Sequence, residues 1–76
     1  MPKPLQRVEE QWLLRYVTEG YQIRFRYHGF FAWAVAAKAR ATPVTICTGS
    51  NDESFVQKRA AINAFVARIK GDNGSH

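Results

Sequence analysis

Apolar and polar residues alternate most regularly between Tyr21 and His28. The odd positions of this stretch are aromatic or aliphatic, whereas the even positions are polar or basic. The side chains of a strand point to opposite faces with a period of two, so the pattern predicts a strand with one apolar face. Its other face would present Arg24, Arg26 and His28 to solvent or to a partner.

A second alternation follows Gly29, where Phe31, Trp33 and Val35 are separated by alanines. Alanine alone favours a helix, and a helix here would make the strands on either side parallel partners in a β-α-β unit. We expect a strand instead, because a hairpin at Gly29 is short and local. The alternation of large and small residues also suits a pleated strand.

The length of the hairpin loop decides which side chains share a face. A three-residue loop at 28–30 places Phe25 opposite Trp33 and collects the large apolar side chains on the buried face, so we expect this register. The outer face would then be flat and basic. A two-residue loop at 29–30 places Arg26 opposite Trp33 instead, and the outer face would combine arginine with aromatic residues, which suits stacking on bases.

A helix is predicted from Leu5 to Glu19, where apolar residues recur at spacings of three and four. Trp12 lies on this apolar stripe, so we expect it in the core. The complete stripe is Leu5, Val8, Trp12, Tyr16 and Val17.

A third strand, Val44–Thr48, is predicted before Gly49, and a second helix over residues 51–70. The second helix starts at a capping-box pattern from Ser50 to Glu53 and stops at Gly71. Its buried stripe is Phe55, Ile62, Phe65, Val66 and Ile69.

These elements give the order α-β-β-β-α in a single domain of 76 residues, with residues 1–4 and 71–76 as loose termini. We expect an α+β fold in which both helices pack on one face of a three-stranded antiparallel sheet. The other face of the sheet would remain open to water or to a partner.

Charge is distributed unevenly along the chain. The net charge is +5, yet no acidic residue occurs between Glu19 and Asp52. A basic middle segment predicts a positive face, for which polyanions are the obvious partner, although a modest positive charge also serves solubility alone. The basic residues of this segment are Arg24, Arg26, Lys38 and Arg40, with His28 beside them.

Catalytic and metal chemistry find little support in the sequence. The chain has one cysteine and two histidines, without a Cys-x-x-Cys or His-x-x-x-His pair. Cys47 lies beside Ile46 in a predicted strand, where an inert buried thiol is expected rather than a nucleophile. We therefore expect a non-enzymatic protein with no metal or cofactor. The single cysteine, the lack of a membrane-spanning run and the lack of a signal peptide suggest a soluble cytoplasmic protein.

Residues 58–64, Lys-Arg-Ala-Ala-Ile-Asn-Ala, together with the order of elements, resemble the double-stranded-RNA-binding domain. That family opens its last helix with Lys-Lys-x-Ala-Lys, often followed by Asn-Ala, and its lysines contact phosphates across the major groove. The resemblance implies phosphate contacts by Lys58 and Arg59. Ile62 stands where the family has its third lysine, and the family's Gly-Pro-x-His loop is missing.

A three-stranded sheet followed by a helix also resembles the DNA-binding domains of plant ethylene-response factors and of some phage integrases. Those domains read the major groove with arginine and tryptophan from the sheet face. Arg24, Arg26 and Trp33 would be the equivalent residues only in the register with the two-residue loop.

These patterns predict a small nucleic-acid-binding module, for RNA or DNA, whose basic sheet face contacts phosphates. The alternative is a small protein-interaction or inhibitor module, encoded by a phage or mobile element. It would use the open sheet face or an edge strand to bind an acidic protein or to dimerise. The candidate nucleic-acid-binding residues are Arg24, Arg26, His28, Lys38, Arg40, Lys58 and Arg59.

Overall fold

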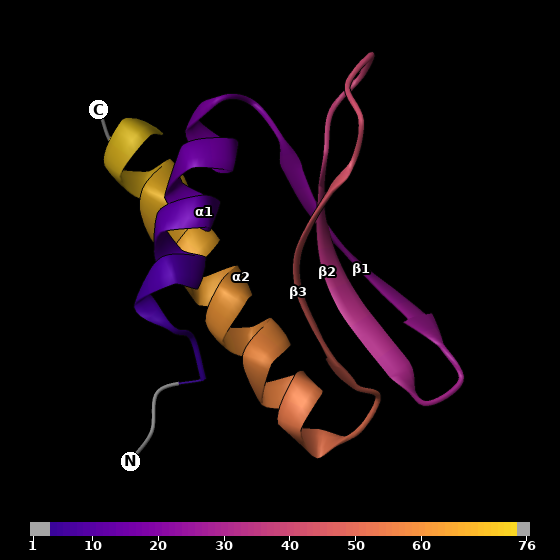
Figure 1. Ribbon diagram of the computed structural model, residues 1–76. Coiled ribbons are helices and arrows are strands. Elements are labelled where there is room, and N and C mark those ends of the chain that lie inside the picture. The colour runs from indigo at the N-terminus through magenta and orange to yellow at the C-terminus, as the bar shows by residue number, and fades with distance from the viewer. Residues whose placement is uncertain (1–3, 75–76) are drawn as a thin grey trace.

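Two helices lie on one face of a three-stranded antiparallel sheet and leave the other face uncovered (Figure 1). The computed structural model describes the backbone of residues 4–74 and the side chains of residues 4–71. The expected α+β fold and the order α-β-β-β-α are confirmed, with strand order β1-β2-β3. The elements are α1 (Arg7–Thr18), β1 (Gln22–His28), β2 (Phe31–Ala37), β3 (Val44–Ser50) and α2 (Glu53–Gly74).

Helix α2 begins and ends later than the sequence suggested. Asp52 caps its N-terminus, because the Asp52 carboxylate accepts hydrogen bonds from the backbone N–H of Ser54 at 3.0 Å and from its hydroxyl at 2.6 Å. These bonds lower the pKa of Asp52, the hydroxyl contributing most. The expected capping box at Ser50 is wrong, since Ser50 is the last residue of β3. The expected stop at Gly71 is also wrong, because α2 continues to Gly74. Of the expected loose termini, 1–4 and 71–76, residues 1–3 and 75–76 lie outside the described residues.

Helix α1 turns a different stripe toward the core than expected. Leu13 and Glu9 are its buried residues, whereas Val8 and Trp12 are exposed. The expected burial of Trp12 is therefore wrong: it is 41% exposed and stacks on Tyr16 with ring centroids 5.7 Å apart. The inner stripe runs through Glu9, a charged residue that a search for apolar spacing passes over.

A two-residue turn at Gly29 and Phe30 joins β1 to β2. Gly29 has φ of 60°, a conformation that favours glycine and occurs at the first central residue of type II′ hairpin turns. Asn51, the residue that follows β3, stabilises this turn. Its backbone N–H donates to the carbonyl of Phe30 at 2.8 Å, and its side-chain amide donates to the carbonyl of Gly29 at 3.1 Å. Gly29 thus sets the geometry of the turn, and Asn51, which is distant in sequence but close in space, stabilises it.

The β1–β2 register is the one with Arg26 opposite Trp33 and Phe25 opposite Ala34. The expected register with a three-residue loop is wrong, because it assumed that all large apolar groups of β2 face the core. The alanines of β2 face the core instead, and Ala32, Ala34 and Ala36 are almost completely buried.

Small residues in the central strand leave room for large ones from the helices. Leu13 of α1 and Ile62 of α2 are fully buried in one cluster with Ala34. The methyl groups of this strand leave room for the leucine and isoleucine side chains, which fill the space between the helices and the sheet. The predicted stripe of α2 is confirmed, with Phe55, Ile62 and Ile69 buried and Phe65 and Val66 partly buried.

Strand β3 adapts to this core through an irregularity and a glycine. The β2–β3 register shifts between Ala34 and Val35, and both Ile46 and Cys47 pack against the core cluster as a result. At Gly49 a Cβ atom would lie 3.1 Å from Cδ1 of Phe55, so the absence of a side chain at this position lets the Phe55 ring pack against the backbone of β3. The ring of Phe55 also packs edge-on against Phe25 at a centroid distance of 6.3 Å.

We expect Ala34→Leu to destabilise the protein by about 1–3 kcal/mol, because extra methylene groups would push the helices away from the sheet. Urea unfolding followed by circular dichroism measures the change. Ala39→Leu is the matched control, since Ala39 is exposed beyond the end of β2, and its stability should stay near the wild-type value. Equal stability of the two variants would mean that the alanine row does not face the helices.

Candidate nucleic-acid interface

The open face of the sheet carries three parallel rows of side chains. The row on β2 is Phe31, Trp33 and Val35. Across the strand pairs, Arg26 lies opposite Trp33, and Thr48 lies opposite Trp33 from the other side. Neighbouring rows on one sheet face stand close enough for side chains to interact across strands. The flanking rows are Arg24, Arg26 and His28 on β1, and Thr45, Thr48 and Ser50 on β3.

Exposure along the middle row increases toward the hairpin turn. Val35 is buried, Trp33 is half-buried, and Phe31 is 68% exposed. Phe30, in the turn itself, is 89% exposed. Aromatic side chains bury more apolar area than most residues when they gain a partner, so this end of the face has the most to gain from a ligand. We call Arg24, Arg26, His28, Phe31 and Trp33 the arginine–aromatic face.

The arginines of this face keep their charge available. Arg24 donates a hydrogen bond to the side-chain oxygen of Gln22 at 2.9 Å, which is a neutral partner. Within residues 4–71 the ion pairs are Arg15 with Glu19 and Lys58 with Glu9, and neither involves β1. Arg24 and Arg26 therefore present two guanidinium groups that no carboxylate of the described chain neutralises.

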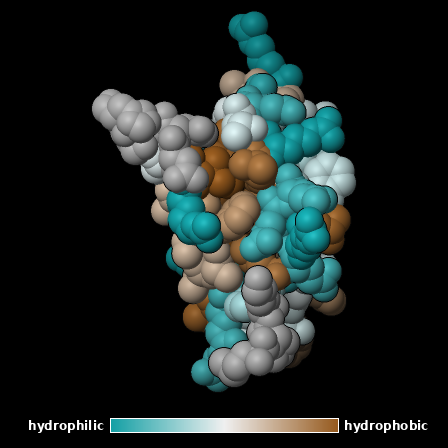
Figure 2. All heavy atoms as spheres, turned by 90° about the vertical axis from the view of Figure 1, so that its left-hand side faces the viewer, coloured by the Kyte–Doolittle hydropathy of each residue, from teal (hydrophilic) through white to brown (hydrophobic). Residues whose placement is uncertain are grey.

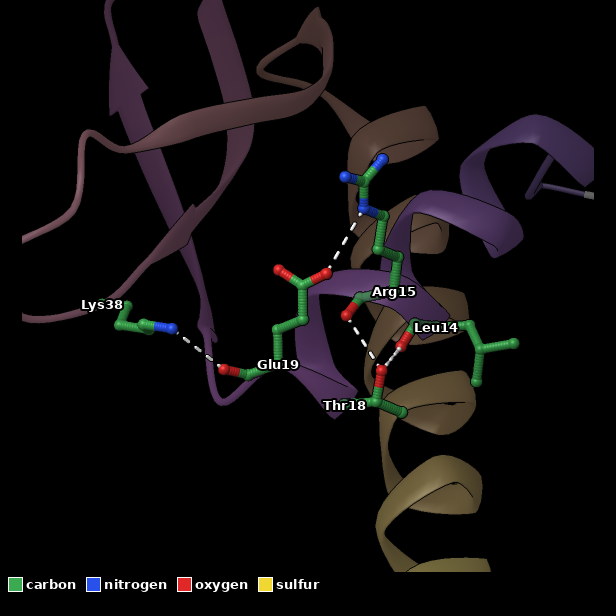
Figure 3. A network of polar contacts seen from close by, with 5 residues as sticks. All are labelled: Leu14, Arg15, Thr18, Glu19 and Lys38. Atoms are coloured by element: carbon green, nitrogen blue, oxygen red, sulfur yellow. Dashed lines mark hydrogen bonds and ion pairs between the residues drawn. The ribbon is translucent and has the colours of Figure 1, made fainter.

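Lys38 and Arg40 lie beyond the far end of β2, away from the exposed aromatic residues. Lys38 donates to the backbone carbonyl of Glu19 at 3.1 Å, and its ammonium group lies 4.9 Å from the ring centre of Tyr21. Figure 3 shows this contact beside the Arg15–Glu19 ion pair at the C-terminus of α1. A cation there also meets the negative end of the helix dipole. Arg40 is exposed in the following turn, with φ of 64°.

Lys58 and Arg59 lie in the helical layer and do not join the open face. Both carboxylate oxygens of Glu9 lie 2.8 Å from the ammonium nitrogen of Lys58, and the two side chains are only 12% and 20% exposed. Arg59 donates to the hydroxyl of Tyr27 at 3.1 Å, and its guanidinium carbon lies 5.5 Å from the ring centre of Phe25. The basic pair of the heptapeptide is thus engaged in holding α2 to α1 and to β1.

The helical side of the molecule has a different character. Figure 2 shows hydrophobic residues gathered in the middle of this side, with hydrophilic ones around them. A shallow hollow of about 310 Å³ lies here, lined mainly by apolar side chains together with Glu10 and Arg68. One acid and one base at the rim offer a polyanion little, so the open sheet face is the stronger candidate.

Other chemistry is sparse in the part of the chain that the structure describes. Burial raises the pKa of the Cys47 thiol, which disfavours the reactive thiolate. No cluster of three or more His, Cys, Asp or Glu side chains suited to a metal occurs among the described residues. Neither of the described helices combines the length and the apolar character needed to cross a bilayer.

Sequence reasoning missed Phe31 as a surface residue and assigned Trp33 to the core. The signal that could have placed both residues was Gly29. A glycine at this position favours a two-residue turn, and such a turn puts Trp33 opposite Arg26 rather than opposite Phe25.

No family model, no curated protein and no solved structure matches this chain. Its function is therefore inferred from the arginine–aromatic face alone.

We expect Lys58→Ala to cost about 2–4 kcal/mol of folding stability, because it leaves a largely buried carboxylate without its cation. Chemical unfolding measures the loss. Lys70→Ala removes an exposed lysine from the same helix and should change stability little. If the two variants were equally stable, the Glu9–Lys58 pair would not be what joins the two helices.

Proposed function

We propose that this protein is a nucleic-acid-binding module that uses its arginine–aromatic face. The observation that carries the proposal is the position of two arginines without carboxylate partners beside exposed aromatic rings, on a sheet with no acidic residue in any strand. Phosphate groups supply the negative charge, and bases supply the flat apolar surfaces, that such a face lacks.

Arginine suits phosphate recognition because its planar guanidinium group stays charged and donates two parallel hydrogen bonds. Arg24 and Arg26 alternate with Phe25 along β1, so both point away from the helices. His28 continues the row toward the turn and can donate a further hydrogen bond. Phosphate contacts of this kind fix the position of the nucleic acid and supply most of the affinity.

The other basic residues have smaller roles in this proposal. Lys38 and Arg40 can extend the positive surface at the far end of the sheet. Lys58 is excluded from the phosphate-binding residues because Glu9 neutralises its charge. Arg59 lies on α2 and donates to the hydroxyl of Tyr27 on β1, so it contributes from the helical side rather than from the open face. The observed register is the one in which Arg24, Arg26 and Trp33 would be the equivalents of the sheet residues in the ethylene-response and integrase domains, so it supports a role for these three side chains in binding.

We expect wild-type protein to bind fluorescein-labelled DNA or RNA oligonucleotides in an anisotropy titration, with affinity that falls as salt rises. The double variant Arg24→Gln/Arg26→Gln should bind more weakly at every salt concentration. The magnitude of its slope of log affinity against log salt should fall by about 1.4–1.8, because two phosphate contacts are lost.

The matched control is Arg7→Gln/Arg68→Gln, which removes the same charge from the exposed surface of the two helices. It should preserve the salt slope. Absence of binding to duplex RNA, duplex DNA and single strands at low salt would reject the proposal. Equal losses in the two double variants would show binding by net charge rather than by this face.

The exposure of Phe30 and Phe31 also favours a second candidate function, an interaction between protein molecules through the same face. Exposed aromatic side chains that lie close together are typical of interface cores. A homodimer or an acidic partner would cover the face and hide the arginines.

Light scattering after size-exclusion chromatography tests this candidate. A protein-interaction role through self-association predicts a dimer mass that Phe31→Ala converts to a monomer, together with weaker nucleic-acid binding at high protein concentration. A monomer mass at all concentrations, with nucleic acid bound, would contradict self-association.

A further inference from the structure

The arginine–aromatic face offers two ring surfaces in series along one strand. Phe31 and Trp33 are two residues apart on β2 and point to the same side of the sheet. The rise of a strand puts their Cα atoms about 6.6 Å apart. This spacing is close to that of neighbouring bases in an extended single strand of nucleic acid.

We propose that the ligand is single-stranded nucleic acid, with two successive unpaired bases held at Phe31 and Trp33. This inference rests on the proposed function and names the class of its ligand. An aromatic ring gains most from the flat face of a base, and in a duplex those faces are stacked and out of reach. The major groove offers only base edges, and the methyl group of thymine is the single apolar contact there. An open row of phenyl and indole groups therefore suits unpaired bases better than a groove.

The residues on either side of the aromatic row fit this ligand. Arg26 lies opposite Trp33 on β1, where its guanidinium group can pair with the phosphate next to the stacked base. On the β3 side, Thr48 lies opposite Trp33 and Ser50 opposite Phe31. Their hydroxyl groups can donate to or accept from base edges and sugars. Charge thus lies on one side of the rings and neutral hydrogen-bonding groups on the other.

The two tryptophans allow a direct test, because Trp33 lies on the face and Trp12 lies on α1 in the helical layer. In the variant Trp12→Phe, Trp33 is the sole tryptophan and reports stacking by loss of fluorescence. Mixed-sequence single-stranded DNA and RNA of ten nucleotides should quench it strongly. The matched duplexes should quench it little and bind more weakly by anisotropy.

Phe31→Ala should lower the affinity for the single strands about tenfold, the size expected for one base–aromatic stack. Its salt slope should match the wild type, because no charge is removed. Val56→Ala is the matched control, since Val56 is an exposed apolar residue on α2 and should affect neither quantity. In Trp33→Phe, the remaining Trp12 should keep its fluorescence when the strands bind.

Three outcomes separate this inference from the proposed function. Duplexes that bind as tightly as single strands, with Trp33 fluorescence and Phe31→Ala affinity unchanged, overturn the single-strand inference and leave nucleic-acid binding intact. Binding of no nucleic acid overturns both. Quenching by single strands supports the inference, and comparison of the DNA and RNA titrations then shows whether the 2′-hydroxyl contributes.

Discussion

The turn between β1 and β2 determines which chemical groups share a surface. Side chains alternate between faces with every residue, so a hairpin loop of two residues and one of three residues give opposite combinations. Gly29 adopts the left-handed conformation of a two-residue turn. Asn51 donates hydrogen bonds to the carbonyl groups of both turn residues, Gly29 and Phe30. Arg26 is therefore paired with Trp33, and the guanidinium groups and the aromatic rings emerge on the same side.

A hydrophobic core still forms with this register, although Phe31 and Trp33 face outward, because the helices supply the large buried side chains. The central strand contributes only methyl groups, at Ala32, Ala34 and Ala36, while Leu13 and Ile62 fill the space above them. Within the helical layer, Glu9 neutralises the charge of Lys58. On the opposite face, Arg24 and Arg26, which pair with no carboxylate of the described chain, lie beside the exposed ring of Phe31 and the half-buried ring of Trp33, and the proposed nucleic-acid ligand is complementary to that combination.

The periodic pattern of the sequence predicted the helices and strands. It did not predict which side chains are buried where several elements pack against one another. Alternation from Tyr21 to His28 gave β1, and spacings of three and four gave the buried stripe of α2 through Ile62. The face that β2 turns toward the core could not be deduced from side-chain size, because an alanine row is buried only when large side chains from other elements cover it. Trp12 was misplaced for a related reason: the inner stripe of α1 includes Glu9, whose burial depends on Lys58 in a distant segment.

The account depends most on the register of β1 against β2, and nuclear Overhauser contacts between facing residues measure it directly. We predict contacts between the α protons of Phe25 and Ala34 and between those of Tyr27 and Ala32, the pairs that face each other in this structure. Contacts joining Phe25 to Trp33 and Tyr27 to Phe31 would contradict the account, because the aromatic rings would then point into the core and leave the arginines without them.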